Sequence, residues 1–180
     1  MSMEDAHSTV EWQVARAAQE HGVDDPAVLA LTLTVHRAMT ALDRAEAAEL
    51  APLGLTVSQL NILTVLHRTD RPLTMGELGQ AVSMRPANLT GVVDGLTRRS
   101  LVERQINPFD RRSYLITKTP AGQEFLAGFL PGHRRYLDRL MHGLTRDERS
   151  MLADLLERLR RSVDTVSEAT RVPDLSGQNS

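Results

Sequence analysis

The chain of 180 residues contains no cysteine, which excludes disulfide bonds, thiolate metal ligands and a nucleophilic thiol. Aromatic residues make up only 3% of it, so a stacking platform for single-stranded nucleic acid is not expected. No apolar run approaches the ~18 residues that span a bilayer, and the polar, acidic N-terminus does not resemble a signal peptide. We therefore expect a cytoplasmic globular protein that has no contact with membranes.

Positive charge is concentrated in one short segment, although the whole chain carries a net charge of −2. Residues 85–118 contain 7 basic and 3 acidic side chains, whereas residues 1–84 contain 5 and 11, and residues 119–180 contain 9 of each. The phosphate backbone of duplex DNA attracts such local cation density. Charge alone leaves two alternatives open, a DNA-binding patch and a solvated charged face.

Long amphipathic helices are predicted on both sides of the basic segment. Apolar side chains recur every three or four residues over 27–50, after the helix-start signal Asp25-Pro26. On the other side, one helix is predicted from about Ala121 to His142, and another follows the capping box Thr145-x-x-Glu148. The apolar stripe of that last helix consists of Met151, Leu152, Leu155, Leu156, Leu159 and Val163. The small module between these helices is too small to cover their stripes, so we expect a two-fold homodimer.

Three shorter helices are predicted between the long ones. Capping boxes at 56–59 and 74–77 begin the first two, and Ser83 is expected to cap the third, which spans about Arg85 to Arg99. The first is expected to bury Leu60, Leu63, Val65 and Leu66, and the second Leu78, Ala81 and Val82.

The third of these helices has two distinct faces. Its buried face is predicted to consist of Leu89, Val92, Val93 and Leu96, which are spaced i, i+3, i+4 and i+7. The opposite face consists of Ala87, Gly91, Asp94 and Arg98, flanked by Asn88 and Thr90. An exposed glycine inside a helix costs roughly 1 kcal/mol relative to alanine. Gly91 therefore indicates close approach of the backbone, either to a DNA groove or to another helix.

The hydrophobic period then changes from helical to extended. Residues 101–106 and 113–117 are predicted to be strands, joined by a turn-rich tip at 107–112 that carries two adjacent arginines. The predicted fold is therefore mainly α with a small β-hairpin: a winged helix-turn-helix flanked by N- and C-terminal dimerisation helices. Such a domain places one helix in the major groove of DNA and its hairpin, the wing, in the adjacent minor groove.

Several segments, in this order and spacing, closely resemble the MarR family of bacterial transcriptional regulators. They are 51–56, 84–96, 101–104 and 110–112, followed by Leu115 and the Thr-Pro-Ala-Gly sequence at 119–122. The resemblance covers about residues 27–165. It implies a homodimer whose first and last helices form the interface, and in many members a small, often phenolic or anionic, ligand that lowers DNA affinity.

The resemblance also implies which residues contact DNA. On the third short helix they are Arg85, Pro86, Ala87, Asn88, Thr90 and Gly91, and the wing tip consists of Asp110, Arg111 and Arg112. We add Arg98 because its charge lies on the same outer face. An asparagine can pair with adenine edges, and arginine suits a narrow, negative minor groove. Asp94 does not suit a surface that faces DNA, so we predict that it pairs with an arginine of the wing.

A capping box at 8–11 predicts an additional helix from about Thr9 to Glu20 that carries Trp12. This helix is similar to the added N-terminal helix of the urate-responsive branch of the family. That branch has an acidic residue and an arginine where this chain has Asn61 and Val92, which argues against urate as the ligand. Trp12 either anchors the helix or stacks on a ligand.

Candidate residues of an effector pocket lie on the helices that flank the expected cleft. They are Trp12, Arg16, His36, Met39, Asn61 and His67. For each of them, core packing or a solvated face is the alternative. The histidines lack the spacing of metal ligands, and there is no glycine-rich phosphate loop or nucleophile motif. We therefore expect no cofactor, no metal and no catalytic residue.

The predicted organisation is an N-terminal extension (1–24), a helical dimerisation region (25–52 and 120–168), a winged helix-turn-helix domain (53–119) and a disordered tail (169–180). The predicted function is a ligand-responsive repressor that binds a pseudo-palindromic operator in double-stranded DNA as a homodimer and is released by an aromatic or anionic effector. The alternatives are a constitutive regulator, an activator without an effector, and a winged-helix module that binds only proteins.

Overall fold

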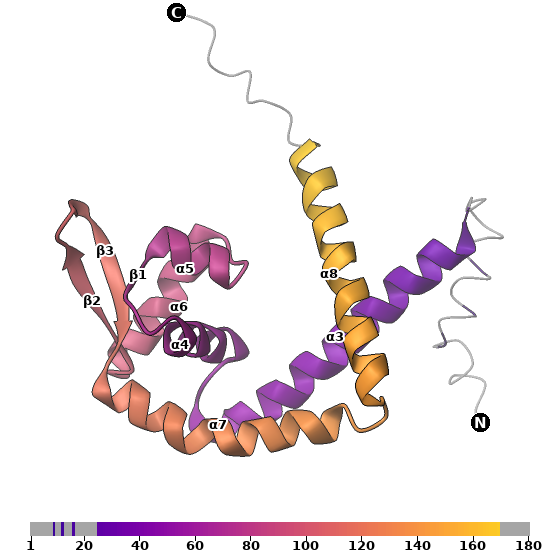
Figure 1. The fold of residues 1–180 in the computed structure, drawn as a ribbon, viewed down its shortest axis with the longest axis horizontal. Helices are drawn as coiled ribbons and strands as arrows, with labels where there is room; N and C mark the ends of the chain where they lie inside the picture. Colours follow the sequence, from indigo (N-terminus) through magenta and orange to yellow (C-terminus); the bar gives the residue numbers. More distant parts are fainter. Residues whose placement is uncertain (1–8, 10–11, 13–15, 17–24, 170–180) are drawn as a thin grey trace, which may run out of the picture. The chain divides into compact units, whose positions relative to one another are not determined.

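The structure is a computed structural model that describes Thr9, Trp12, Arg16 and residues 25–169. The chain divides into two compact units, one ending at Leu126 and one beginning at Ala127. Apart from those three positions, the expected N-terminal helix lies outside the described residues, as does the tail from residue 170. Figure 1 shows the order of the elements along the chain.

The first unit contains a long helix, a helix-turn-helix and a small sheet (Figure 1). Its elements are α3 (Pro26–Leu50), the 3-10 helix η1 (Ala51–Leu53), α4 (Val57–Thr69), β1 (Leu73–Thr74), α5 (Met75–Ala81), α6 (Pro86–Arg98), β2 (Val102–Asn107), β3 (Asp110–Lys118) and the first turns of α7 (Pro120–Leu140). A mainly helical winged helix-turn-helix is therefore confirmed.

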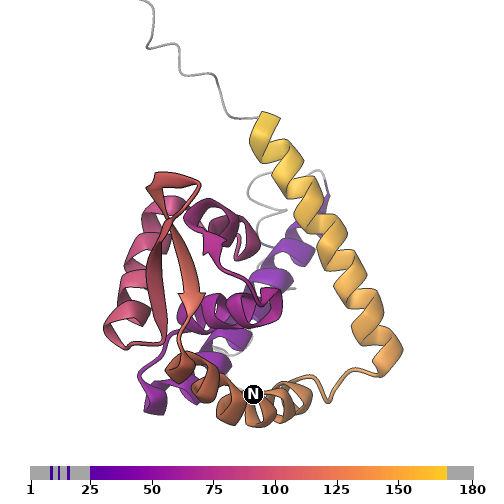
Figure 2. The same cartoon turned by 60° about the vertical axis from the view of Figure 1, so that its left-hand side comes forward.

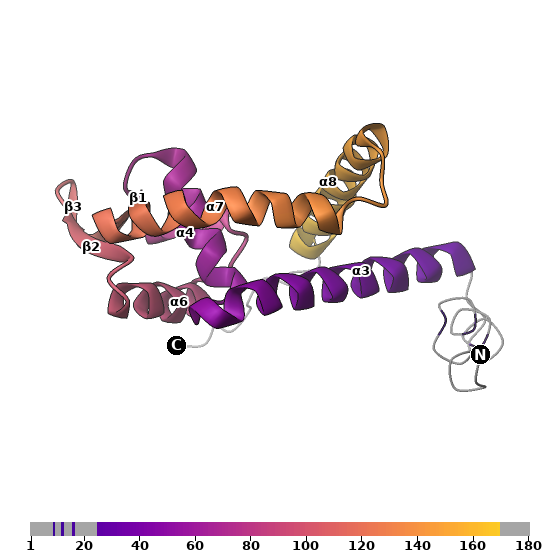
Figure 3. The same cartoon turned by 90° about the horizontal axis from the view of Figure 1, so that it is seen from below.

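Helix α3 begins where the sequence predicts. The Asp25 carboxylate accepts a hydrogen bond from the Ala27 backbone N–H at 2.9 Å, and the helix continues unbroken to Leu50 (Figure 3). Leu50 is fully buried, whereas Val28, Leu31 and Met39 are 57–60% exposed. Part of the apolar stripe of α3 is therefore exposed in the single chain.

Helix α4 is the centre of the first unit, because it contacts α3, α5, α6 and β3. Both hydrogen bonds of its capping box, between Thr56 and Gln59, are present. Its buried side chains are Leu60, Ile62, Leu63 and Leu66. The prediction missed Ile62, and Val65 is only half-buried. A single apolar stripe underestimates the number of buried side chains in a helix that packs against neighbours on several sides.

In helix α5, the prediction that Ala81 faces inward is wrong. Ala81 is exposed, and Gly79 is buried beside Leu78 instead. A Cβ atom added to Gly79 would lie 3.2 Å from the Met84 carbonyl oxygen and 3.4 Å from a Leu89 methyl group. The missing side chain at Gly79 therefore lets α6 pack closely against α5.

Ser83 does not cap α6, contrary to the prediction. Arg85 is the N-cap, with extended backbone angles (φ −66°, ψ 142°) and no hydrogen bond from its side chain to the helix. The residue before a proline avoids the α region, so a helix with Pro86 at its first position cannot begin earlier. Ser83 instead adopts a left-handed φ of +52° in the turn between α5 and α6.

The three strands form an antiparallel sheet in the order β1-β3-β2, and the hairpin of β2 and β3 forms the wing (Figure 2). Strand β1 was not predicted, because two residues carry no periodic signal; it forms by pairing with β3, Leu73 opposite Ile116. The tip is also tighter than predicted. Asn107 is paired with Asp110, so the turn is formed by Pro108 and Phe109.

The second unit contains the rest of α7 and helix α8 (Arg146–Ala169). The capping box between Thr145 and Glu148 is present, as predicted. The predicted apolar stripe of α8 is exposed along its whole length. Its exposed fractions are Met151 65%, Leu152 42%, Leu155 49%, Leu156 43%, Leu159 39% and Val163 53%.

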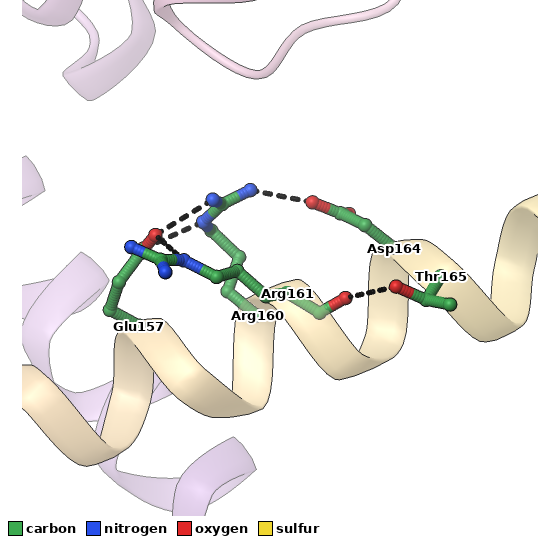
Figure 4. Close-up of polar contacts among 5 residues, drawn as sticks. All are labelled: Glu157, Arg160, Arg161, Asp164 and Thr165. Atoms are coloured by element: carbon green, nitrogen blue, oxygen red, sulfur yellow. Dashed lines mark hydrogen bonds and ion pairs between the residues drawn. The ribbon is translucent and has the colours of Figure 1, made fainter.

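A ladder of ion pairs lies on the other side of α8 (Figure 4). Glu157 accepts hydrogen bonds from Arg160 and Arg161, and Arg160 also reaches Asp164 at 2.5 Å. These arginines lower the pKa of Glu157 to about 2, so its carboxylate stays ionised at neutral pH. At 100° per residue, the ladder lies opposite Leu155 and Leu159. Helix α8 therefore has one charged, solvated face and one uncovered apolar face.

Within the described residues, no single helix is long and apolar enough to cross a membrane. Residues Pro26–Leu53 and Val57–Thr69 pass the length and composition criteria only as a pair, and that pair is bent by 83°.

Candidate nucleic-acid interface

The outer face of α6 carries small and hydrogen-bonding side chains, as predicted. Arg85, Pro86, Ala87, Asn88, Thr90 and Gly91 are all exposed, and so is Arg98 at the end of the helix. Leu89, Val93 and Leu96 are fully buried on the opposite face, and Val92 is half-buried. A Cβ atom added to Gly91 would meet nothing within 4 Å. In the described part of the chain, no other helix therefore lies against Gly91, which favours the groove interpretation.

Asp94 pairs with an arginine of the wing, which confirms the prediction. An oxygen of its carboxylate lies 2.5 Å from the Arg104 guanidinium on strand β2, near the base of the wing. Both side chains are partly exposed, at 43% and 31%. An ion pair of this kind contributes little to overall stability. Its role is local, because it joins α6, the recognition helix that is expected to enter the major groove, to the wing and neutralises one arginine.

Replacement of Asp94 with alanine is expected to lower the discrimination between an operator and a scrambled duplex. The substitution frees Arg104 to contact phosphate, which raises binding to any duplex, and it releases the wing from α6, which weakens the specific geometry. Fluorescence anisotropy with both duplexes gives the ratio of the affinity for the operator to the affinity for the scrambled duplex. Glu103→Ala is the matched control, because it also removes one negative charge and lies on β2 next to Arg104. Equal ratios for the two variants would contradict a positioning role for Asp94.

Arg99 holds the end of the recognition helix against the start of the winged domain. Its guanidinium donates hydrogen bonds to the carbonyl oxygens of Gly54 and, at 2.7 Å, of Leu53. On the other side of the unit, Lys118 of β3 pairs with Asp70 at 2.7 Å and lowers the pKa of that carboxyl. The sequence did not distinguish these structural cations from DNA-facing ones. Arg99, Arg104 and Lys118 have partners within the fold, which leaves four exposed arginines on α6, its N-cap and the wing tip: Arg85, Arg98, Arg111 and Arg112.

The wing tip is organised by side chains that bond to the backbone. The Asn107 side-chain oxygen accepts from the Phe109 backbone N–H at 3.0 Å, and the Asp110 carboxylate accepts from the Arg112 backbone N–H at 3.0 Å. The Ser113 hydroxyl donates to the Asp110 carbonyl oxygen at 3.1 Å. Asp110 therefore shapes the turn, while Arg111 and Arg112 extend from it into solvent.

Helix α5 is fixed to the sheet at its first turn. The Glu77 carboxylate accepts hydrogen bonds from the backbone N–H and the hydroxyl of Thr74, at 2.8 and 2.9 Å, and pairs with Arg71 at 2.9 Å. The Thr74 backbone bond, followed by the Arg71 bond, lowers the pKa of Glu77 to about 2. The carboxylate is therefore ionised at any pH near neutrality, and the cap that positions the helix-turn-helix does not titrate there.

The candidate pocket residues come from three separate stretches. Arg16 lies over the Trp12 ring at 5.5 Å, His36 and Met39 are exposed on α3, and Asn61 is exposed on α4. His67, also on α4, is half-buried, and its buried Nδ1 has no hydrogen-bond partner within the described residues. A common pocket for these residues remains a prediction. Over residues 25–169 and the three described N-terminal positions, no group of three His, Asp or Glu side chains is arranged to hold a metal ion.

A helix-turn-helix with an exposed recognition helix, an arginine-bearing wing and four exposed arginines defines a winged-helix DNA-binding protein. The family model described as "MarR family" matches residues 53–113. The reduced form of MarR from Escherichia coli is 30% identical, with a TM-score of 0.59, over 72% of this chain and 95% of that chain. The chain belongs to the MarR family of transcriptional regulators.

Two further comparisons concern DNA binding and repression. A cysteine-to-serine mutant of E. coli MarR in complex with operator DNA is 28% identical, with a TM-score of 0.68, over 74% of this chain and 95% of that chain. The HTH-type transcriptional repressor YetL of Bacillus subtilis (strain 168) is 34% identical over an alignment of 111 residues that covers 59% of this chain and 66% of YetL. YetL is named as a transcriptional repressor, and the MarR structure contains operator DNA.

Proposed function

We propose that the protein is a homodimeric transcriptional repressor that binds a pseudo-palindromic operator through α6 and the wing and is released by a small aromatic or anionic effector. One observation supports DNA binding above all. Four exposed arginines lie at the two ends of α6 (Arg85 and Arg98) and at the wing tip (Arg111 and Arg112), where a winged-helix protein contacts the two grooves of DNA. The similarity to a MarR structure with operator DNA supports the same orientation.

The exposed apolar faces support the homodimer. Val28, Leu31 and Met39 of α3, together with the stripe of α8, would cost solvation free energy if they stayed in water. A second copy of the chain offers a matching apolar surface under two-fold symmetry. Two recognition helices would then read half-sites about one helical turn, ~34 Å, apart. We assign residues 25–52 and 120–168 to dimerisation and residues 53–119 to DNA binding.

Release by an effector rests on the family resemblance and on the candidate pocket residues. The alternative is a regulator that binds DNA without an effector. A thermal-shift screen of aromatic carboxylates and phenols distinguishes the two. A ligand that raises the Tm and lowers operator affinity supports effector release. A ligand that stabilises the protein without changing DNA affinity supports the alternative.

The test of DNA binding is an anisotropy titration against the upstream intergenic DNA of the protein's own gene and against a scrambled duplex, at several salt concentrations. We expect tight binding that is sensitive to salt and selective for the natural sequence. Equal affinity for both duplexes at all salt concentrations would contradict the proposed operator.

Replacement of Arg112 with alanine is expected to weaken operator binding and to lower the slope of log K against log salt by about one unit, as for one lost phosphate contact. Arg158→Ala, at an exposed position of α8, is the matched control and should leave the slope unchanged. An unchanged slope for Arg112→Ala would place the wing away from the DNA.

A further inference from the structure

The wing carries an exposed aromatic side chain at its tip. Phe109 is 95% exposed, more than any other large apolar side chain in the described part of the chain. It stands in the two-residue turn after Pro108, immediately before Asp110. A phenylalanine in water at the end of a projecting hairpin contributes nothing to the core, so the fold gives no reason for it.

The turn presents Phe109 in an ordered way. The Phe109 backbone N–H is held by the Asn107 side-chain oxygen at 3.0 Å, and the Asn107 amide nitrogen donates to the Ser113 hydroxyl across the hairpin at 3.0 Å. The register shifts between Ile106 and Asn107, and such an irregularity turns the end of a strand to a new direction. The backbone at Phe109 is therefore held by hydrogen bonds, and the ring projects from it into solvent.

A further apolar pair leads from the recognition helix toward this tip. Ile106 and Tyr114 face each other across the hairpin and are 65% and 52% exposed. Since side chains alternate along a strand, Ile106 shares a face with Arg104, which contacts α6 through Asp94. The apolar pair therefore lies on the face of the wing that is turned toward the recognition helix.

We propose that Phe109 acts as a wedge in the minor groove beside each half-site, where its ring packs against the sugars, partly unstacks one base step and bends the duplex. This proposal rests on the proposed operator binding. Exposed Arg111 and Arg112 follow Phe109 closely, so the tip combines an apolar ring with positive charge. A minor groove accepts this combination, since arginine favours its negative potential and apolar side chains insert between base steps. An apolar protein surface does not, because the arginines would lose their hydration without a partner.

Two measurements on the full-length protein test the wedge. 2-Aminopurine placed in turn at each step of the half-site flank reports unstacking, and energy transfer between dyes at the two duplex ends reports bending. Wild-type protein should raise the 2-aminopurine fluorescence at one flank step and bring the ends closer together. Phe109→Ala should abolish both signals and lower operator affinity by about 5- to 150-fold, the range for removing one aromatic–base contact. The salt slope should stay unchanged, unlike that of Arg112→Ala.

Two control variants make the result specific. Phe109→Leu, which keeps an apolar wedge, should restore most of the bend, and Gln105→Ala, on the other face of β2, should behave as wild type. If the wild type binds the operator selectively but Phe109→Ala binds equally well, or binds less without any change in base stacking, the wedge is excluded. If the wild type shows no preference for the operator, the proposed function fails first, and a change in oligomeric state on Phe109→Ala would assign the ring to a protein contact.

Discussion

The double variant Leu155→Asp/Leu159→Asp is expected to be a folded monomer whose operator affinity is at least about a hundredfold below that of the wild type. The two side chains are 49% and 39% exposed on α8 in the single chain, so the monomer is expected to tolerate charge at these positions. In a dimer, the same positions would place unpaired carboxylates in an apolar interface. A monomer engages only one half-site. It therefore loses the gain in affinity that a dimer obtains when its second recognition helix binds the neighbouring half-site at high effective concentration.

Sedimentation equilibrium gives the oligomeric state, circular dichroism checks the fold, and anisotropy gives the affinity. Thr165→Asp is the matched control. It introduces a single carboxylate beside the ion-pair ladder of α8 and should remain dimeric (Figure 4). A stable dimer of the double variant with wild-type affinity would show that the interface lies elsewhere.

Replacement of Gly122 with alanine is expected to cause the largest loss of stability of any single methyl group added to a described glycine. A Cβ atom at this position would lie 2.1 Å from the carbonyl oxygen of Leu101 and 3.0 Å from its carbonyl carbon. Both obstacles are backbone atoms of Leu101, and its carbonyl oxygen accepts a hydrogen bond from the Thr119 backbone N–H at 3.2 Å. The Thr119 hydroxyl donates to the Ser100 carbonyl oxygen at 2.6 Å and accepts from the Gly122 N–H at 3.0 Å. The first turn of α7 therefore cannot move away without breaking the junction with the wing.

The expected cost is about 3 kcal/mol, at the upper end for overpacking, or about 6–12 °C in Tm for a chain of this size. Thermal unfolding followed by circular dichroism measures it. Gly128→Ala, on the same helix, is the matched control. A Cβ atom there would meet nothing within 4 Å, so the variant should be as stable as the wild type or gain up to about 1 kcal/mol. An unchanged Tm for Gly122→Ala would contradict close packing of α7 against Leu101.

Periodicity and capping signals were enough to predict most of the winged domain. Each helix of the helix-turn-helix begins at or near its local start signal, because a capping box or a proline at the first helical position acts within four residues. The pairing of Asp94 with a wing arginine was also predictable, since an acidic side chain on a surface that faces DNA requires a cation. Each of these predictions depends on residues that are close together in the sequence.

The failures share a different origin. Ile62 and Gly79 are buried because several elements converge on them, and the two-residue strand β1 exists only where β3 is beside it. Arg85, and not Ser83, is the N-cap of α6, because the residue before Pro86 avoids the α region. The preference for serine at helix starts takes no account of this restriction. The roles of Arg99 and Lys118 were equally hidden, because their partners lie more than forty residues away along the chain.

The sequence by itself therefore determined the class of fold, the face of the recognition helix that points outward and the segment in which positive charge gathers. All three depend on the spacing of residue types over one or two helical turns or one strand. Only the tertiary structure decided which cations remain for DNA, where glycine is required by close packing and how tightly the wing turns around Phe109. Those outcomes depend on contacts between distant segments, which form only when the chain has folded.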